Sequence, residues 1–117
     1  MLSAAHRLTD GASFREAVRM GRRSGTRTVV VHLATGPSPD GPPRVGFVVS
    51  KAVGNAVTRN RVKRRLRHLA REHVSSLPGS AVLVVRALPA AASASSAELG
   101  ADLVRCLRRV QAQEVRA

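Results

Sequence analysis

Aromatic residues and acids are both scarce in this chain of 117 residues. It contains two Phe, no Trp and no Tyr, so a surface on which several bases stack, as in RNP or OB domains, is not expected. With seven acids against twenty Lys and Arg, the formal charge is +13. A charge of this size predicts an anionic partner, which is either a nucleic acid or an anionic membrane surface.

Cysteine and long apolar stretches are lacking as well. The single Cys106 cannot form an internal disulfide, and no Cys or His cluster has metal-ligand spacing, so neither a structural zinc nor another metal site is expected. No stretch approaches the roughly 18 apolar residues of a membrane span, and the first residues lack a signal-peptide pattern. We therefore expect one cytoplasmic domain over residues 1–117, with no membrane partner.

The shortage of acids is most marked between Lys51 and Arg71, where eight of the twenty basic residues lie without one Asp or Glu. On a helix, one narrow stripe of this segment would face a core and consists of Val62, Leu66, Leu69 and His73. The opposite side consists of Asn60, Arg64, Arg67 and Arg71. The segment is therefore predicted to be one helix with a core side and a cationic side.

The other segments predict an α+β fold with helices packed on one sheet. Expected helices cover residues 11–20, residues 56–76 and, after a capping box of Ser95 and Glu98, the last part of the chain. Expected strands cover residues 28–34, 44–50 and 81–86. Residues 36–43 should form a loop joining two antiparallel strands, and residues 89–96 a linker with some mobility.

A bound polyanion explains the cationic helix better than solvent does. Seven cations between Arg59 and Arg71 have no acid to pair with and repel one another if that face is merely solvated. Arg59 and Arg61 also lie beside the positive end of the helix dipole. Phosphates relieve both costs. The face lacks the variety of a base-reading helix, which slightly favours RNA over DNA.

Phe14, Val18 and His32 form a second candidate group. If the first helix lies on the sheet, Phe14 and Val18 point toward it, and ordinary core packing is their simplest role. His32 alternates with apolar residues on its strand, as a half-buried histidine does, and contact with a ligand is the second interpretation. No combination of histidine, acid and serine forms a catalytic group, so the sequence indicates a binding protein rather than a self-sufficient enzyme.

The basic segment also carries a family resemblance. Residues 51–67, Lys-Ala-Val-Gly-Asn-Ala-Val-Thr-Arg-Asn-Arg-Val-Lys-Arg-Arg-Leu-Arg, resemble the RNR signature of the bacterial ribonuclease P protein subunit. The preceding strand, ending Val-Gly-Phe-Val-Val-Ser50, is similar to the strand found there in that family. Other matching landmarks are Arg7-Leu8, Phe14 ahead of Gly21, Arg44-Val-Gly46, and Arg86 before Pro89.

The resemblance implies an α-β-β-β-α-β-α two-layer sandwich like the second domain of ribosomal protein S5, with four strands and a left-handed βαβ crossover. Pattern alone gave three strands, and such crossovers are usually right-handed. The resemblance also implies an endoribonuclease whose catalyst is an RNA subunit. That RNA uses Mg²⁺ to remove the 5′ leader of precursor tRNA, while the protein alone has no catalytic residue.

The resemblance implies a role for each residue of this chain that matches the family motif. The resemblance implies that the face toward the catalytic RNA consists of Lys51, Asn55, Arg59, Asn60, Arg61, Lys63, Arg64 and Arg67, and the cationic side of the helix adds Arg71. It also implies a leader-binding cleft at Phe14, Val18 and His32, where the family often has aromatic residues at the last two positions. This cleft therefore keeps one aromatic side chain.

Two other classes of protein share some of these features. A structural RNA-binding protein, such as a ribosomal component, has similar size and charge. A DNA-binding helix module is the third possibility, and it would need more varied side chains on its recognition helix. The RNA that co-purifies with the protein would separate these classes.

Overall fold

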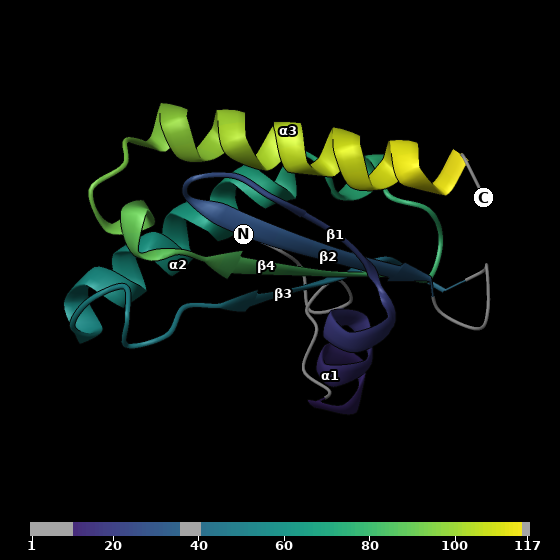
Figure 1. Cartoon of the computed structure of the whole chain (residues 1–117), viewed down its shortest axis with the longest axis horizontal. Helices are drawn as coiled ribbons and strands as arrows, with labels where there is room; N and C mark the ends of the chain where they lie inside the picture. The colour runs from purple at the N-terminus through teal and green to yellow at the C-terminus, as the bar shows by residue number, and fades with distance from the viewer. Residues whose placement is uncertain (1–10, 36–40, 116–117) are drawn as a thin grey trace.

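The computed structural model describes residues 11–35 and 41–115, which form a four-stranded mixed sheet with helices on both faces (Figure 1). The elements in chain order are α1 (Gly11–Met20), β1 (Arg22–Gly25), β2 (Val29–Thr35), β3 (Arg44–Val48), α2 (Ala56–Arg71), η2 (Val74–Ser76), β4 (Ala81–Ala87), η3 (Pro89–Ala92) and α3 (Ser96–Val115). This order confirms the expected α-β-β-β-α-β-α arrangement.

The strand order is β1-β2-β4-β3. β2 is antiparallel to both β1 and β4, whereas β3 runs parallel to β4. β2 and β3, which the expected loop at residues 36–43 connects, run in opposite directions as predicted, but they are not neighbours, because β4 pairs between them. α2 therefore connects two parallel neighbours, as a crossover helix must. The left-handed sense of this connection stays a prediction.

The main core lies between the sheet and the layer formed by α2 and α3. Leu33 of β2 and Leu83 of β4 meet Leu66 of α2 and Leu103 of α3, and all four side chains are almost fully buried. Alternate residues of the same strands face α1 on the other side, where Ala17 packs against Val82 and Val84. Strand β4 is thus covered on both faces, as its continuous apolar run predicted.

Three segments differ from the pattern-based expectation. Residues 22–25 form β1, which the basic and polar composition of this stretch concealed. Helix α2 ends at Arg71, and the turn of 3-10 helix at Val74–Ser76 replaces its expected last turn. The expected linker at residues 89–96 is largely packed, since it contains η3 and buries Ala91 and Ala94.

Candidate nucleic-acid interface

The chain enters α2 through a glycine and an asparagine. Gly54 adopts a φ of +156°, a backbone conformation that residues with a Cβ rarely adopt. This conformation turns the chain away from β3 toward α2. Asn55 then caps the helix, because its side-chain oxygen accepts a hydrogen bond from the backbone N–H of Thr58 at 2.9 Å. Buried Val62, Leu66 and Ala70 fix the rotation of α2 against the core.

The opposite side of α2 is a cationic row. We call this the outer face of α2, and it consists of Asn60, Arg64, Arg67 and Arg71, all exposed. Lys51 and Asn55, which precede the helix, are exposed as well. Within the described residues no ion pair reaches any of these side chains. The outer face therefore presents three guanidinium groups from a helix whose orientation the core determines.

The remaining predicted contacts lie on the flanks of α2. Arg59, Arg61 and Lys63 are only partly exposed. The Arg61 guanidinium donates a hydrogen bond to the backbone carbonyl of Ala92 at 2.9 Å, and Arg65 donates to that of Ala94 at 3.4 Å. The Nε atoms of Arg59 and Arg61 are buried without a hydrogen-bond partner among the described residues. The structure thus separates Arg61 from the outer face and turns it toward η3.

A second candidate surface is a groove of about 320 Å³ between α1 and the sheet. Phe14 and Val18 line it, as the resemblance implied. Its other lining residues are Arg15, Arg19, Val48 and Arg86. We call this set the α1 groove. Because it combines apolar side chains with three arginines, it suits a ligand that has both flat apolar groups and negative charge.

The floor of the α1 groove depends on a glycine. A Cβ placed on Gly46 of β3 would lie 2.2 Å from the Cζ atom of Phe14, a distance that no real contact allows. The ring therefore lies directly over the β3 backbone, and it is only partly buried. Gly46 is thus required for the position of the one aromatic side chain in the groove.

His32 lies on the same side of the sheet but does not line the α1 groove. It pairs with Arg23 of β1 and Val84 of β4, and only 6% of its surface is exposed. Burial lowers the pKa of His32 below its ordinary value, and the nearby Arg23 and Arg86 lower it further. Its Nδ1 atom has no hydrogen-bond partner in the part of the chain that the structure describes. His32 is therefore a buried imidazole whose surroundings disfavour its protonated form.

Three arginines of the α1 groove were missed as site residues. Arg15 and Arg19 of α1, which no sequence pattern indicated as site residues, line the groove beside Phe14 and Val18. Arg86 is the one exposed residue in the otherwise buried strand β4. A lone cation in an apolar run was the available signal, since burying an unpaired charge is costly and the arginine must therefore reach an open surface.

Metal ligands and membrane segments are not found in the described part of the chain. No group of three or more His, Cys, Asp or Glu within residues 11–35 and 41–115 could hold a metal ion. Among the same residues, no helix combines the length and apolar character needed to cross a membrane.

Comparison with known proteins identifies a family and several similar proteins. A family model described as Ribonuclease P matches residues 2–111. The ribonuclease P protein component of a Nocardioides species is 75% identical over 114 residues, covering 97% of each chain. That of Streptomyces avermitilis is 51% identical over 117 residues, covering 94% of this chain and 95% of the relative.

Solved structures show the same fold. The Staphylococcus aureus RNase P protein has a TM-score of 0.79 and 29% sequence identity, covering 89% of this chain and 94% of that one. The Thermotoga maritima RNase P protein has a TM-score of 0.75 at 22% identity, which is similarity of fold alone. With the family model matching almost the whole chain, this protein belongs to the ribonuclease P protein component family.

Proposed function

We propose that this chain is the protein subunit of a ribonuclease P holoenzyme and takes part in 5′ maturation of tRNA in the cytoplasm. In this proposal the outer face of α2 binds the catalytic RNA. The observation that carries it is the exposed row of Asn60, Arg64, Arg67 and Arg71, which no acid within the described residues neutralises. A phosphate backbone supplies the missing negative charge.

The chemistry of the outer face favours contact with phosphates over reading of bases. Arginine forks bind phosphate oxygens with two parallel hydrogen bonds, which fixes the orientation of the bound strand. Contacts of this kind position a protein on nucleic acid without selecting a sequence. The outer face contains no aromatic side chain, so specificity for one RNA would come from the shape of that RNA.

We assign the 5′ leader of precursor tRNA to the α1 groove. A single strand exposes bases that can lie on Phe14 and Val18, while its phosphates reach Arg15, Arg19 or Arg86. Because only one aromatic side chain is present, the stacking area is small, and the three arginines carry a larger share of the contact. His32 is not assigned to leader contact, since it is buried and does not line the groove.

The protein supplies no group that cuts RNA in this proposal. The reaction needs divalent metal ions such as Mg²⁺, and the described residues offer no cluster of oxygen or nitrogen ligands that fits one. We therefore assign hydrolysis to the RNA subunit, and the protein to binding the two RNAs. Precursor tRNA and the catalytic RNA are its partners, and no DNA partner is included.

Reconstitution tests the proposed function. The purified protein should not cut precursor tRNA alone, whereas the protein added to the RNA subunit at low Mg²⁺ should yield mature 5′ ends faster than the RNA does alone. Cleavage by the protein alone, or no stimulation of the RNA, would contradict the assignment. Recovery of ribosomal RNA as the co-purifying species would instead support a structural RNA-binding protein.

A further inference from the structure

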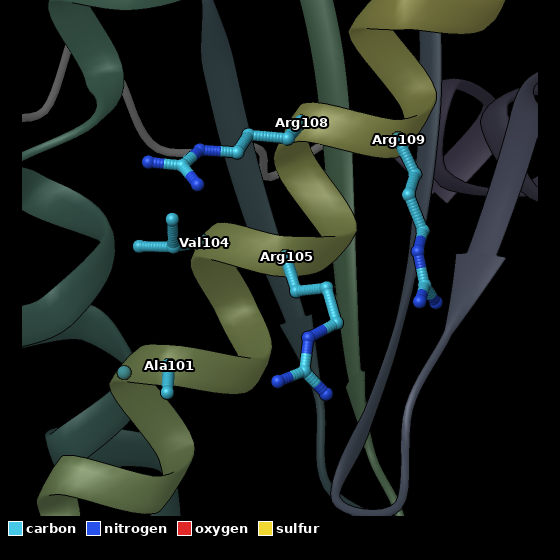
Figure 2. A pocket seen from close by; sticks show the side chains of 6 residues that line it. Ala101, Val104, Arg105, Arg108 and Arg109 are labelled. Atoms are coloured by element: carbon cyan, nitrogen blue, oxygen red, sulfur yellow. The ribbon is translucent and has the colours of Figure 1, made fainter.

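A third group of arginines lies on the outward side of α3. Arg105, Arg108 and Arg109 are all exposed, and they belong neither to the outer face of α2 nor to the α1 groove. A shallow hollow of about 470 Å³ runs along this side of the helix and is lined by Gly100, Ala101, Val104, Arg105, Arg108 and Arg109 (Figure 2). We call these six residues the α3 surface.

The acids near the α3 surface already have partners. Glu98 accepts hydrogen bonds from the Arg27 guanidinium at 2.9 Å and from the Ser95 backbone at 3.0 Å. Asp102 accepts one from the Thr28 hydroxyl at 2.5 Å, and its other oxygen lies 4.0 Å from Arg105. Arg109 donates a hydrogen bond to the backbone carbonyl of Gly25 at 3.4 Å, and no ion pair within the described residues reaches Arg108 or Arg109. The α3 surface therefore keeps a net positive charge.

The spacing of these arginines is unfavourable for α3 when no anion is bound. Arg105 lies three residues before Arg108 and four before Arg109, so like charges occupy neighbouring positions on one face. Such like-charged pairs destabilise a helix. A bound anion removes this repulsion.

The shape of the α3 surface indicates which kind of anion. Figure 2 shows that Arg108 extends to one side of α3, whereas Arg105 and Arg109 extend to the other. Guanidinium groups that diverge in this way do not converge on one small anion, and they suit an extended polyanion that crosses the helix. The small side chain of Ala101 leaves room for a backbone to approach. No aromatic side chain lies on the α3 surface, so base stacking has no part.

We propose that the α3 surface is an additional, sequence-independent binding site for the sugar-phosphate backbone of RNA. α3 lies across the face of the sheet opposite α1 (Figure 1), so a strand in the α1 groove does not reach it. The site therefore engages a further segment of RNA, and the protein holds RNA on both sides of its sheet. This inference does not depend on which RNA the outer face of α2 selects.

Salt dependence of binding tests this site. The probe is an RNA duplex of mixed sequence unrelated to tRNA, so the result is separate from any cleavage assay. Wild-type protein and the double variant Arg105→Ala/Arg108→Ala are titrated at several salt concentrations. Loss of one or two phosphate contacts should lower the slope of log affinity against log salt by about 1 to 2 units. A slope equal to that of wild type would overturn the proposal.

Two controls accompany the titration. Arg27→Ala removes an arginine whose charge Glu98 already neutralises, so its slope should match that of wild type. Unchanged circular dichroism should show that the double variant folds, as expected for exposed positions. If it does not fold, Arg108→Gln alone replaces it, with an expected fall of about 1 unit in slope. No fall in that variant likewise overturns the proposal.

Cross-linking tests where on the protein the RNA binds. The sole cysteine, Cys106, is buried, so a cysteine introduced at exposed Ala101 can carry a photoreactive group selectively. Illumination with the same RNA duplex should attach RNA at Ala101→Cys more efficiently than at Gly79→Cys, an exposed position on the turn before β4. Equal or weaker attachment at position 101 would contradict binding at the α3 surface.

Discussion

The guanidinium of Arg61 donates a hydrogen bond to the carbonyl oxygen of Ala92, 31 positions away in sequence, at 2.9 Å. Arg65, one turn later on α2, reaches the carbonyl of Ala94. Both acceptors belong to the segment that leads into the capping box of α3, where the Ser95 hydroxyl accepts from the Glu98 backbone at 3.1 Å. Two cations of the basic helix therefore hold η3 and the start of α3 against α2.

This contact predicts that Arg61 acts on stability rather than on RNA affinity. Replacing Arg61 with Ala removes a charge-assisted hydrogen bond, which is worth about 1.5 to 3 kcal/mol at most. We expect the free energy of unfolding in urea to fall by about 1 to 2 kcal/mol, while the salt slope of RNA binding stays that of wild type.

Arg64→Ala is the matched control for Arg61→Ala, because Arg64 is exposed on the outer face of α2. It should change the free energy of unfolding by no more than about 0.5 kcal/mol and should weaken RNA binding. If Arg61→Ala instead lowers the salt slope and leaves stability unchanged, Arg61 contacts RNA as the family motif implied.

The basic helix shows which features of the structure could be predicted from the sequence and which could not. Local signals were sufficient for α2: Asn55 at the cap, Val62 and Leu66 on the buried side, and Arg64 and Arg67 outside. The capping box at Ser95 was likewise local and is confirmed. The role of Arg61 was not predictable, because its acceptor is a carbonyl of a distant segment whose own position depends on tertiary packing.

The sheet was predicted less completely for the same reason. Strand β1 is short and polar, and pairing with β2 rather than its own composition makes it a strand. The insertion of β4 between β2 and β3 is a choice among pairings that no local pattern decides. His32 was rightly placed on a strand among apolar neighbours, but the extent of its burial depends on tertiary packing that no local pattern decides.

The outer face of α2 yields a second prediction. The double variant Arg64→Ala/Arg67→Ala should weaken assembly with the ribonuclease P RNA by about 1 to 3 kcal/mol in total, since each arginine loses charge-assisted contacts. Filter binding at moderate salt measures this. Glu72→Ala, an exposed neighbour of opposite charge at the end of α2, is the control and should not weaken binding. Unchanged affinity of the double variant would reject this placement of the RNA.

The buried His32 predicts loss of stability in acid. Its pKa in the folded protein lies below the ordinary 6.5, so the unfolded chain binds a proton more readily than the folded chain does. The contribution of His32 to the free energy of unfolding should be constant above pH 6.5. It should decrease as the pH falls through 6.5 and below. Urea unfolding between about pH 7.5 and pH 5.5 measures the decrease.

His32→Gln should remove most of that pH dependence, whatever its effect on absolute stability, because glutamine does not titrate. A pH profile that is the same in wild type and His32→Gln would show that His32 is not the group responsible.

The α1 groove predicts selective loss of precursor binding. Phe14→Ala or Arg86→Ala should weaken binding of the holoenzyme to precursor tRNA and leave binding of mature tRNA unchanged. For Phe14→Ala, where a stacked base is lost, the expected loss is about 1 to 3 kcal/mol. Glu16→Ala, an exposed α1 position outside the groove lining, should affect neither. Equal losses for both tRNAs would indicate that these side chains act through packing and not through the leader.

The contact between Phe14 and Gly46 gives the last prediction. Gly46→Ala places a methyl group where the ring now lies, 2.2 Å from its Cζ atom, so the ring must move and the free energy of unfolding should fall by about 1 to 3 kcal/mol. Gly25→Ala is the matched control, because its Cβ would meet Val30 at an ordinary 3.4 Å. In a Phe14→Ala background the cost of Gly46→Ala should largely disappear, because the clashing ring is gone, and urea unfolding of the four proteins measures this coupling. If Gly46→Ala costs the same with and without the ring, Phe14 does not lie over β3, and the groove floor proposed for the leader is not built as described.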